Sequence, residues 1–228
     1  MKIGIILTPD TRSKAYLQKI IQNHIEMDTI IFMNDGRIEK KFEPEIISSG
    51  IKNGFDISIT VKETLERSNL KYYELDFVDI NNSKLIELVK QSKTDIFIFT
   101  GGGILKNQIL NAGPKFIHLH PGIVPDYRGS TCFYYSILNE NQCGVTAFFM
   151  NEKLDTGDII FQRIFKKPNH IFVDDIYDSN IRSETLIEIL QKGLLLNSSY
   201  KKQDPSIGET YFIIHPVLKH IAILSCVK

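Results

Sequence analysis

Two residue types are scarce in this sequence. It contains no tryptophan, and its three cysteines are Cys132, Cys143 and Cys226. An odd number of cysteines without CxxC spacing predicts reduced thiols with a structural role. Neither internal repeats nor low-complexity segments appear, so the composition is that of an ordinary globular protein.

An excess of charge of either sign is also absent. Lys and Arg together number 27, as do Asp and Glu, which leaves a formal net charge of zero at pH 7. A neutral chain has no bulk attraction to polyanions or to anionic membranes. The charge balance therefore predicts no nucleic-acid partner, and it argues against a tRNA substrate.

Long apolar runs are lacking as well. The apolar start, residues 1–8, is too short for a signal peptide and leads into polar residues. No later run approaches the length of a membrane span. These absences predict a cytoplasmic protein with no membrane partner.

The first part of the chain alternates between strand and helix patterns. An apolar strand is expected over Lys2–Leu7, a helix with apolar spacing over Ser13–Ile25, and a second strand over Thr29–Met33. This order is typical of α/β proteins with a parallel sheet. At 228 residues, the chain is long enough for one sizeable core with a small annex.

The alternation continues after an irregular stretch, Asn34–Phe55, which we interpret as a surface connection or a mobile flap. Further elements are expected as follows: a helix over Thr60–Arg67, a strand over Lys71–Leu75, a helix over Ser83–Gln91, a strand over Asp95–Thr100, and a short helix over Thr131–Leu138. A helix over Val173–Lys192, stopped by Gly193, would begin the annex. We therefore expect a catalytic domain over residues 1–172 and an annex of a helix and a short strand over residues 173–228.

Candidate functional residues concentrate between residues 116 and 162. A buried strand is expected to end in His118-Leu119-His120, followed by Pro121. Side chains alternate along a strand, so His118 and His120 share one face while Leu119 points to the core. Asp155 follows in a turn between two strand-like runs. Each residue alone also has a structural interpretation, as a surface or core histidine or as a turn carboxylate. No third ligand has convincing spacing, so no metal is predicted.

Four motifs in this stretch resemble those of the folate-dependent formyltransferase family. They are His118–Gly122, Pro125–Gly129, Gly144–Thr146 and Leu154–Gly157. The resemblance implies a Rossmann-like formyltransferase fold with a mostly parallel sheet. It places the family's catalytic histidine on His120 and its catalytic aspartate on Asp155. The family's asparagine falls on His118, a departure that preserves a hydrogen-bond donor but changes its reach and charge.

The implied reaction moves a formyl group from 10-formyltetrahydrofolate to an amine. Attack of the amine on the formyl carbon places negative charge on the formyl oxygen, which preorganised donors stabilise. His118 and His120 are expected to supply such donors. Asp155 is expected to orient or protonate one histidine and to accept the amine's proton, directly or through a water.

The resemblance also implies the folate pocket. Its expected lining is Gly101, Gly102, Gly103, Ile104 and Leu105, together with Asn151, Lys153 and Leu154. Three glycines after a central strand remove every Cβ where the backbone turns, so a flat ring can lie close to it. Open α/β folds usually bind ligands at the carboxyl ends of such strands.

The acceptor is expected to contact Arg128, Tyr127 and Thr156. A guanidinium holds paired oxygens well, although Arg128 can equally tie its loop to backbone carbonyls, and the tyrosine can equally fill the core. Without glycines, Thr8–Ser13 disfavours a glycinamide ribonucleotide acceptor. The tail looks too short for the barrel that initiator-tRNA formyltransferases append.

The whole length is similar to bacterial sugar N-formyltransferases, including pseudaminic-acid pathway enzymes. The expected acceptor is therefore a nucleotide-linked amino sugar used in surface glycan biosynthesis. Another small amine, such as an aminoacyl group, remains an alternative. So does a folate-binding relic without turnover, because His118 replaces the family's asparagine. The sequence does not decide whether the protein forms a homodimer.

Overall fold

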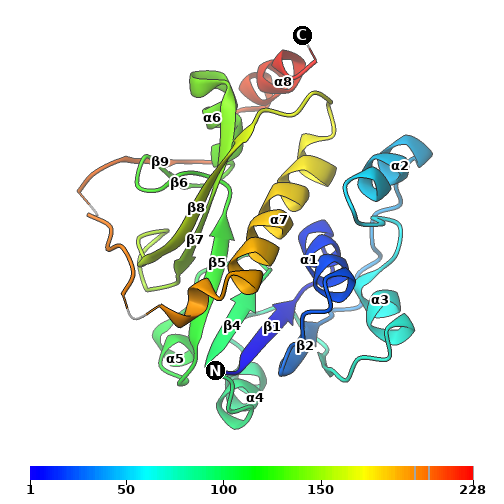
Figure 1. The fold of residues 1–228 in the computed structure, drawn as a ribbon, viewed down its shortest axis with the longest axis vertical. Coiled ribbons are helices and arrows are strands. Elements are labelled where there is room, and N and C mark those ends of the chain that lie inside the picture. The colour runs from blue at the N-terminus through cyan, green and yellow to red at the C-terminus, as the bar shows by residue number, and fades with distance from the viewer. Residues whose placement is uncertain (198, 205, 228) are drawn as a thin grey trace. The chain divides into compact units, whose positions relative to one another are not determined.

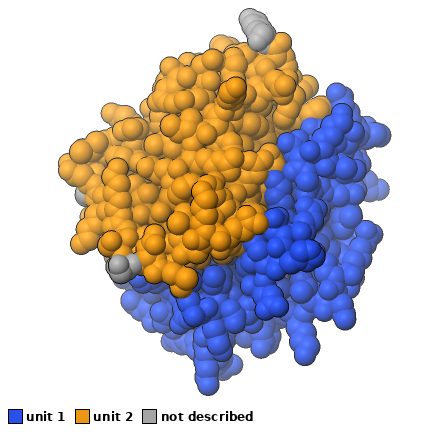
Figure 2. Space-filling model, viewed as in Figure 1, with its two compact units in different colours: residues 1–118 blue, residues 119–228 orange. Residues whose placement is uncertain are grey.

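Strand β5 (Lys115–His120), which carries both histidines, crosses the boundary between two compact units of the chain. In this computed structural model the units are Met1–His118 and Leu119–Lys228 (Figure 2). The structure describes residues 1–197, 199–204 and 206–227; Ser198, Pro205 and Lys228 of the expected annex lie outside the described residues. The units divide at a different place from the domain boundary expected at residue 172, which stays a prediction.

The first unit is a parallel sheet with helices (Figure 1). Its elements are β1 (Ile3–Leu7), α1 (Thr11–Gln22), β2 (Thr29–Met33), α2 (Pro44–Lys52), α3 (Val61–Arg67), β3 (Tyr73–Leu75), α4 (Ser83–Gln91), β4 (Ile96–Phe99) and α5 (Asn107–Leu110). Its strands lie in the order β3-β2-β1-β4-β5, and all four pairings are parallel. The predicted α/β class is confirmed.

Buried strands and capped helices explain why the sequence predicts this unit well. Every residue of β2 and β4 is buried, as expected for strands covered on both faces. Helix α1 begins at Asp10, whose carboxylate accepts from the Ser13 N–H at 2.7 Å. Helix α3 begins at a capping box between Thr60 and Glu63. The predicted bounds of β2 and α4 are confirmed without shift.

The interpretation of residues 34–55 as irregular throughout is wrong. Residues 34–43 form neither helix nor strand, but α2 follows directly. Pro44 occupies the first helical position, where its missing N–H costs nothing, and Glu45 lies in the first turn. These start signals outweigh Gly50, which lies inside the helix.

The second unit combines an antiparallel pair with helices (Figure 1). Its elements are β6 (Tyr127–Gly129), α6 (Cys132–Glu140), β7 (Gln142–Phe149), β8 (Ile159–Lys166), a π-helical turn (Val173–Tyr177), α7 (Asp178–Gln191), a 3₁₀ turn (Leu194–Leu196), β9 (Glu209–Tyr211) and α8 (Pro216–Ser225). Strands β7 and β8 pair antiparallel, and β6 pairs with β9 in parallel. The pair β6–β9 was not expected, because residues 125–129 read as a loop.

Two expectations, for the end of a helix and for the cysteines, are met in this unit. Helix α7 stops before Gly193, whose φ is +62°. All three cysteines are free and buried. In the described part of the chain, no helix has both the length and the apolar character to cross a membrane.

Candidate active site

The second unit brings His120 and Asp155 together. The Nδ1 atom of His120 lies 3.4 Å from Asp155 Oδ2, and its Nε2 atom lies 2.9 Å from the carbonyl oxygen of Tyr127. Only 2% of the His120 side chain is exposed, against 12% for Asp155. The carboxylate is therefore the part of this pair that a substrate can reach more readily.

The His120 ring sits at the end of a rigid strand. Leu119 and His120 are both buried, so burial does not distinguish the two faces of β5 at this end, and the expectation that His118 and His120 share one face stays a prediction. Arg182 of α7, itself buried, donates to the Leu119 carbonyl at 3.1 Å and to Asp178 at 2.8 Å. Sequence reasoning missed Arg182, which fixes the strand end from 63 residues away.

Asp155 is held by a strained turn. Its φ is +52°, a left-handed conformation that costs a non-glycine residue about 1–2 kcal/mol. The Gly129 N–H donates to Asp155 Oδ2 at 2.8 Å. Gln203 donates from Nε2 to the carbonyls of Asp155, at 3.1 Å, and of Gly157, at 2.6 Å. These contacts hold the carboxylate toward His120 against the strain.

Gln203 was also missed from the sequence. It lies in a stretch without helix or strand, 48 residues after Asp155, and no motif marks it. Its Oε1 atom is buried and has no hydrogen-bond partner among the described residues. The side chain is therefore committed to the turn through its amide nitrogen.

The proton positions follow from the partners of the ring. The Tyr127 carbonyl only accepts, so His120 Nε2 carries a proton. Burial is the largest influence on the ring and lowers the pKa of His120, while Asp155 opposes that effect. A neutral ring leaves the Nδ1 lone pair facing the carboxylate. One added proton can then be shared between Nδ1 and Asp155 Oδ2, so the pair is suited to take a proton from a reacting group.

This lowered pKa predicts how stability depends on pH. As the pH falls through about 6.5, the unfolded His120 binds a proton while the folded ring stays neutral, so the folded state loses stability. We expect the wild type to lose more unfolding free energy than His120→Gln between about pH 7.5 and about pH 5.5. Urea unfolding at each pH measures both proteins, and parallel curves would contradict the assignment.

The expected acceptor residues have internal partners. Arg128 is 6% exposed and donates to the carbonyls of Ile207 and Gly208, at 2.8 and 3.4 Å. Such contacts are expected if Arg128 ties its loop to backbone carbonyls. Tyr127 is buried, donates to Glu140 at 2.8 Å and has its pKa raised to about 12 by burial. A role for either side chain in acceptor binding stays a prediction.

The expected folate-binding stretches belong to different units, residues 101–105 to the first and residues 151–154 to the second. In the first unit, a Cβ on Gly101 would lie 2.8 Å from Phe99, whereas Gly102 has open space around it, and Ile104 is 68% exposed. In the second unit, Asn151 accepts from the Lys153 N–H at 3.0 Å and from the Thr156 hydroxyl at 3.1 Å. Leu154 is 51% exposed. The expected role of these residues in folate binding stays a prediction.

The cysteine near the site is unsuited to nucleophilic chemistry. Cys132 is fully buried, and burial raises its pKa to about 12. A thiol needs its thiolate form to act as a nucleophile. Among the described residues, no group of three or more His, Cys, Asp or Glu side chains could hold a metal ion.

Comparison with known proteins gives a consistent family. Residues 10–180 match the family model described as formyl transferase. The methionyl-tRNA formyltransferase of Clostridioides difficile is 32% identical over 197 residues, which cover 84% of this chain and 59% of that protein. The chain spans about half to three fifths of the length of the curated relatives it matches.

Solved structures share the fold. Glycinamide ribonucleotide transformylase 1 from Symbiobacterium toebii superposes with a TM-score of 0.62 at 15% identity, covering 90% of this chain and 94% of that chain. An N-formyltransferase from Helicobacter canadensis, in complex with folinic acid and dTDP-3-aminofucose, gives 0.62 at 17% identity and covers 100% of this chain and 80% of that one. Each has the same mostly parallel α/β architecture as this chain.

Proposed function

Because this chain belongs to the formyl transferase family, we propose that it transfers the formyl group of 10-formyltetrahydrofolate to the amine of a nucleotide-linked amino sugar. The observation that carries the proposal is the contact of His120 with Asp155 at 3.4 Å, inside the stretch that matches the family. The pair supplies a proton acceptor where amine attack needs one.

In the proposed reaction, the acceptor's amine attacks the formyl group of the folate. The amine nitrogen bonds to the formyl carbon, and negative charge develops on the formyl oxygen. Asp155, steadied by His120 and Gly129, takes the amine's proton. The bond from the formyl carbon to N10 of the folate then breaks, and the proton passes to N10. The products are the formamide and tetrahydrofolate.

Two observations bear on the acceptor. Fold neighbours include sugar N-formyltransferases, and one was solved with dTDP-3-aminofucose. The chain also has a net charge of zero, which favours a small acceptor over a polyanion. The second candidate is the aminoacyl group of a tRNA. It is favoured by the curated relatives, which are methionyl-tRNA formyltransferases.

Release of tetrahydrofolate tests the proposal. The protein is supplied with 10-formyltetrahydrofolate and, in separate reactions, a dTDP- or UDP-linked amino sugar or methionyl-tRNA. Release with the amino sugar and little with the tRNA is expected. The reverse pattern would replace the first candidate by the second, and no release with any amine would favour a folate-binding relic.

His118 is proposed to donate a hydrogen bond to the formyl oxygen as its charge develops. If only a donor is needed, His118→Asn should retain or improve turnover, because an amide also donates. His118→Ala should lower kcat by about 100-fold, the scale of one lost oxyanion donor. Comparison of kcat for the two variants shows whether any hydrogen-bond donor at position 118 is sufficient. Equally slow variants would mean that the imidazole itself is required.

Gln203 is proposed to position Asp155 through the two carbonyls of its turn. Gln203→Leu removes both hydrogen bonds at similar size and should lower kcat by about 10- to 100-fold, the scale of a misplaced catalytic group. The loss should nearly vanish in an Asp155→Asn background if Gln203 acts through Asp155. An equal loss in both backgrounds would assign Gln203 another role.

A further inference from the structure

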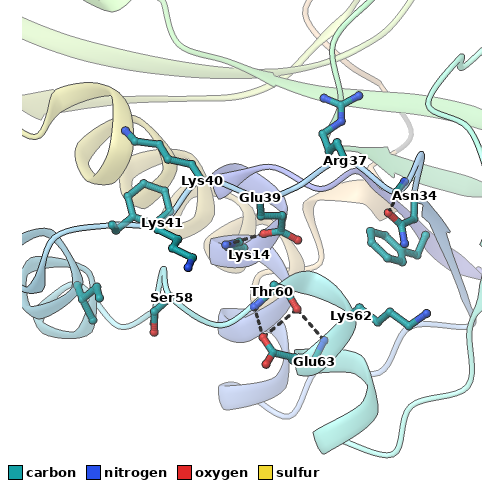
Figure 3. A pocket seen from close by; sticks show the side chains of 14 residues that line it. Lys14, Asn34, Arg37, Glu39, Lys40, Lys41, Ser58, Thr60, Lys62 and Glu63 are labelled. Carbon is teal, nitrogen blue, oxygen red and sulfur yellow. Dashed lines mark hydrogen bonds and ion pairs between the residues drawn. The ribbon is translucent and has the colours of Figure 1, made fainter.

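The first unit contains a cavity of about 680 Å³ whose charged lining includes side chains that bind one another (Figure 3). Lys14 pairs with Glu39 at 2.7 Å, and Glu63 accepts from the N–H and the hydroxyl of Thr60 at 2.8 and 2.9 Å. These contacts serve the fold of the first unit, since they neutralise a buried lysine and cap α3. A polar network in the second unit differs from them because it leads to His120.

The network begins at Thr146, which is fully buried in β7 and belongs to the motif Gly144–Thr146. Its hydroxyl donates to the Gly122 carbonyl at 2.7 Å and accepts from the Val124 N–H at 3.2 Å. A carbonyl only accepts, so the direction of the first bond is fixed. One side chain therefore holds both ends of the segment Gly122–Val124, which we call the histidine loop.

Gln162 of β8 completes the network from the neighbouring strand. It lies directly opposite Thr146 in the antiparallel pair, where the side chains of opposed residues meet on one face. Its Nε2 atom donates to the Val124 carbonyl at 2.7 Å and to the Thr146 hydroxyl at 3.2 Å. The amide thus places one hydrogen on the histidine loop and the other on the group that holds this loop.

The histidine loop begins shortly after His120 and lies against its ring. A Cβ on Gly122 would lie 2.8 Å from His120 Nε2 and 2.8 Å from the carbonyl oxygen of Tyr127. These two atoms form one hydrogen bond, of 2.9 Å. The Ile123 carbonyl in turn accepts from the Tyr127 N–H at 3.0 Å. A shift of the histidine loop toward the ring would therefore press on that hydrogen bond, and a shift away would pull on Tyr127.

We propose that Thr146 and Gln162 are positioning residues for His120. By fixing the histidine loop, they keep the Tyr127 carbonyl at Nε2 of the ring, which holds the proton on that nitrogen. In a histidine, the nitrogen that carries the proton is set by the hydrogen bonds of the ring. The two residues thus act on the reacting groups without touching them.

The position of this proton decides how basic Asp155 is. With Nε2 protonated, the Nδ1 lone pair of His120 faces the carboxylate at 3.4 Å and can share a proton that the carboxylate takes up. If the Tyr127 carbonyl moves, the proton can pass to Nδ1 and be donated to Asp155, which makes the carboxylate a weaker base. The inference rests on the proposed function, in which Asp155 takes the proton of the amine.

NMR of the imidazole nitrogens tests the inference on the whole protein, without folate or acceptor. The signals of His120 are identified by their loss in His120→Gln, and the wild type should show the form protonated on Nε2. Thr146→Val removes the hydroxyl at a similar shape and should shift these signals toward the form protonated on Nδ1. Thr146→Ser keeps the hydroxyl and should restore the signals of the wild type.

Steady-state kinetics give the second measurement. Thr146→Val and Gln162→Met should each lower kcat by about 10- to 100-fold, the scale of a misplaced catalytic group. KM for the acceptor should change little, and the double variant should lose little more than either single variant, because both act on one loop. Gln162 is only partly buried, so Gln162→Met keeps the inference testable if Thr146→Val does not fold.

Thr185→Val is the matched control for Thr146→Val. Thr185 of α7 is also fully buried, and its hydroxyl donates to the Ile181 carbonyl at 2.8 Å. The control loses a buried hydrogen bond of the same kind, but its ring signals and kcat should be those of the wild type. An equal change in Thr185→Val would assign the effect to any lost buried hydroxyl and overturn the inference.

Two further outcomes would overturn it. Normal kcat in the folded variants Thr146→Val and Gln162→Met would show that the histidine loop needs neither residue. Lowered kcat with unchanged His120 signals would mean that they act by another route.

Failure of the proposed function is distinguishable, because the ring signals need neither folate nor turnover. A shift of the His120 signals in Thr146→Val, in a protein that transfers formyl to no amine, would contradict only the function. Formyl transfer by the wild type, with kcat and ring signals unaffected by Thr146→Val, would contradict only the inference.

Discussion

Asp155→Asn should lower kcat for formyl transfer by about 100- to 10,000-fold, the contribution typical of a positioned general base. Asparagine has nearly the same shape, and its Oδ1 can still accept from the Gly129 N–H, a contact of 2.8 Å in the wild type. Its amide cannot take a proton from the amine. The variant should therefore fold normally, and KM for the acceptor should change little because the lost interaction belongs to the transition state.

Asp158→Asn is the matched control for this prediction. Asp158 lies three residues further along the same turn and is also partly buried, but no contact with His120 is found for it among the described residues. Its kcat should stay near that of the wild type. Steady-state kinetics of the three proteins, with folding checked by thermal unfolding, decide the question. Near-normal turnover in Asp155→Asn would remove Asp155 from the mechanism, and an equal loss in Asp158→Asn would indicate a general effect of charge in the turn.

Local patterns in the sequence were enough to predict the parallel sheet. Strands such as β2 and β4 are continuous apolar runs, and helix α4 carries its own start signal at Asn82, whose side chain accepts from the Lys84 N–H. These signals act over a few residues, so a single sequence contains them in full. Helix α2 was missed because nearby turn residues masked the start signal at Pro44.

The central pair of the candidate site could also be predicted, but the residues that hold it could not. The order of the motifs indicated that Asp155 would approach His120, and the two side chains do lie 3.4 Å apart. Arg182 and Gln203 act on backbone carbonyls 63 and 48 residues away. Periodicity and turn chemistry carry no information about such partners, because any buried donor at the right place would serve.

The role of Arg128 could not be decided from the sequence either. The sequence allowed either an acceptor-binding guanidinium or a structural one, since both need the same fork of donors. The choice depends on residues 207–208, which were expected only as part of the annex and whose carbonyls accept from Arg128. Only the pairing of β6 with β9 brings their carbonyls to Arg128.

Gly157→Ala should be the most destabilising single substitution in the turn that carries Asp155. A Cβ at this position would lie 1.5 Å from the carbonyl oxygen of Phe149 and 2.8 Å from its carbonyl carbon. Both atoms belong to backbone, which cannot rotate away as a side chain does. Phe149 is also tied to the turn by its N–H, which donates to the Asp158 carbonyl at 3.0 Å. The added methyl must therefore push the turn away from the end of β7.

We expect a loss of about 3 kcal/mol or more in unfolding free energy, the upper range for overpacking. For a chain of this length, that corresponds to a fall in Tm of roughly 6–12 °C. Gly102→Ala is the control for stability, because nothing lies within 4 Å of its Cβ position and its φ is outside the left-handed region. Calorimetry of both variants measures the difference, and equal Tm values would show that the turn can move without cost.

The same substitution should also separate stability from catalysis. At a temperature where Gly157→Ala is still folded, displacement of the turn breaks the hold of Gln203 on the Asp155 and Gly157 carbonyls, so the carboxylate leaves its place beside His120. The rate should then fall by about 100-fold, the scale of a misplacement of 1 Å. If the folded variant turns over normally, the close fit of Gly157 against Phe149 stabilises the fold without positioning Asp155, and Gln203→Leu should be silent as well.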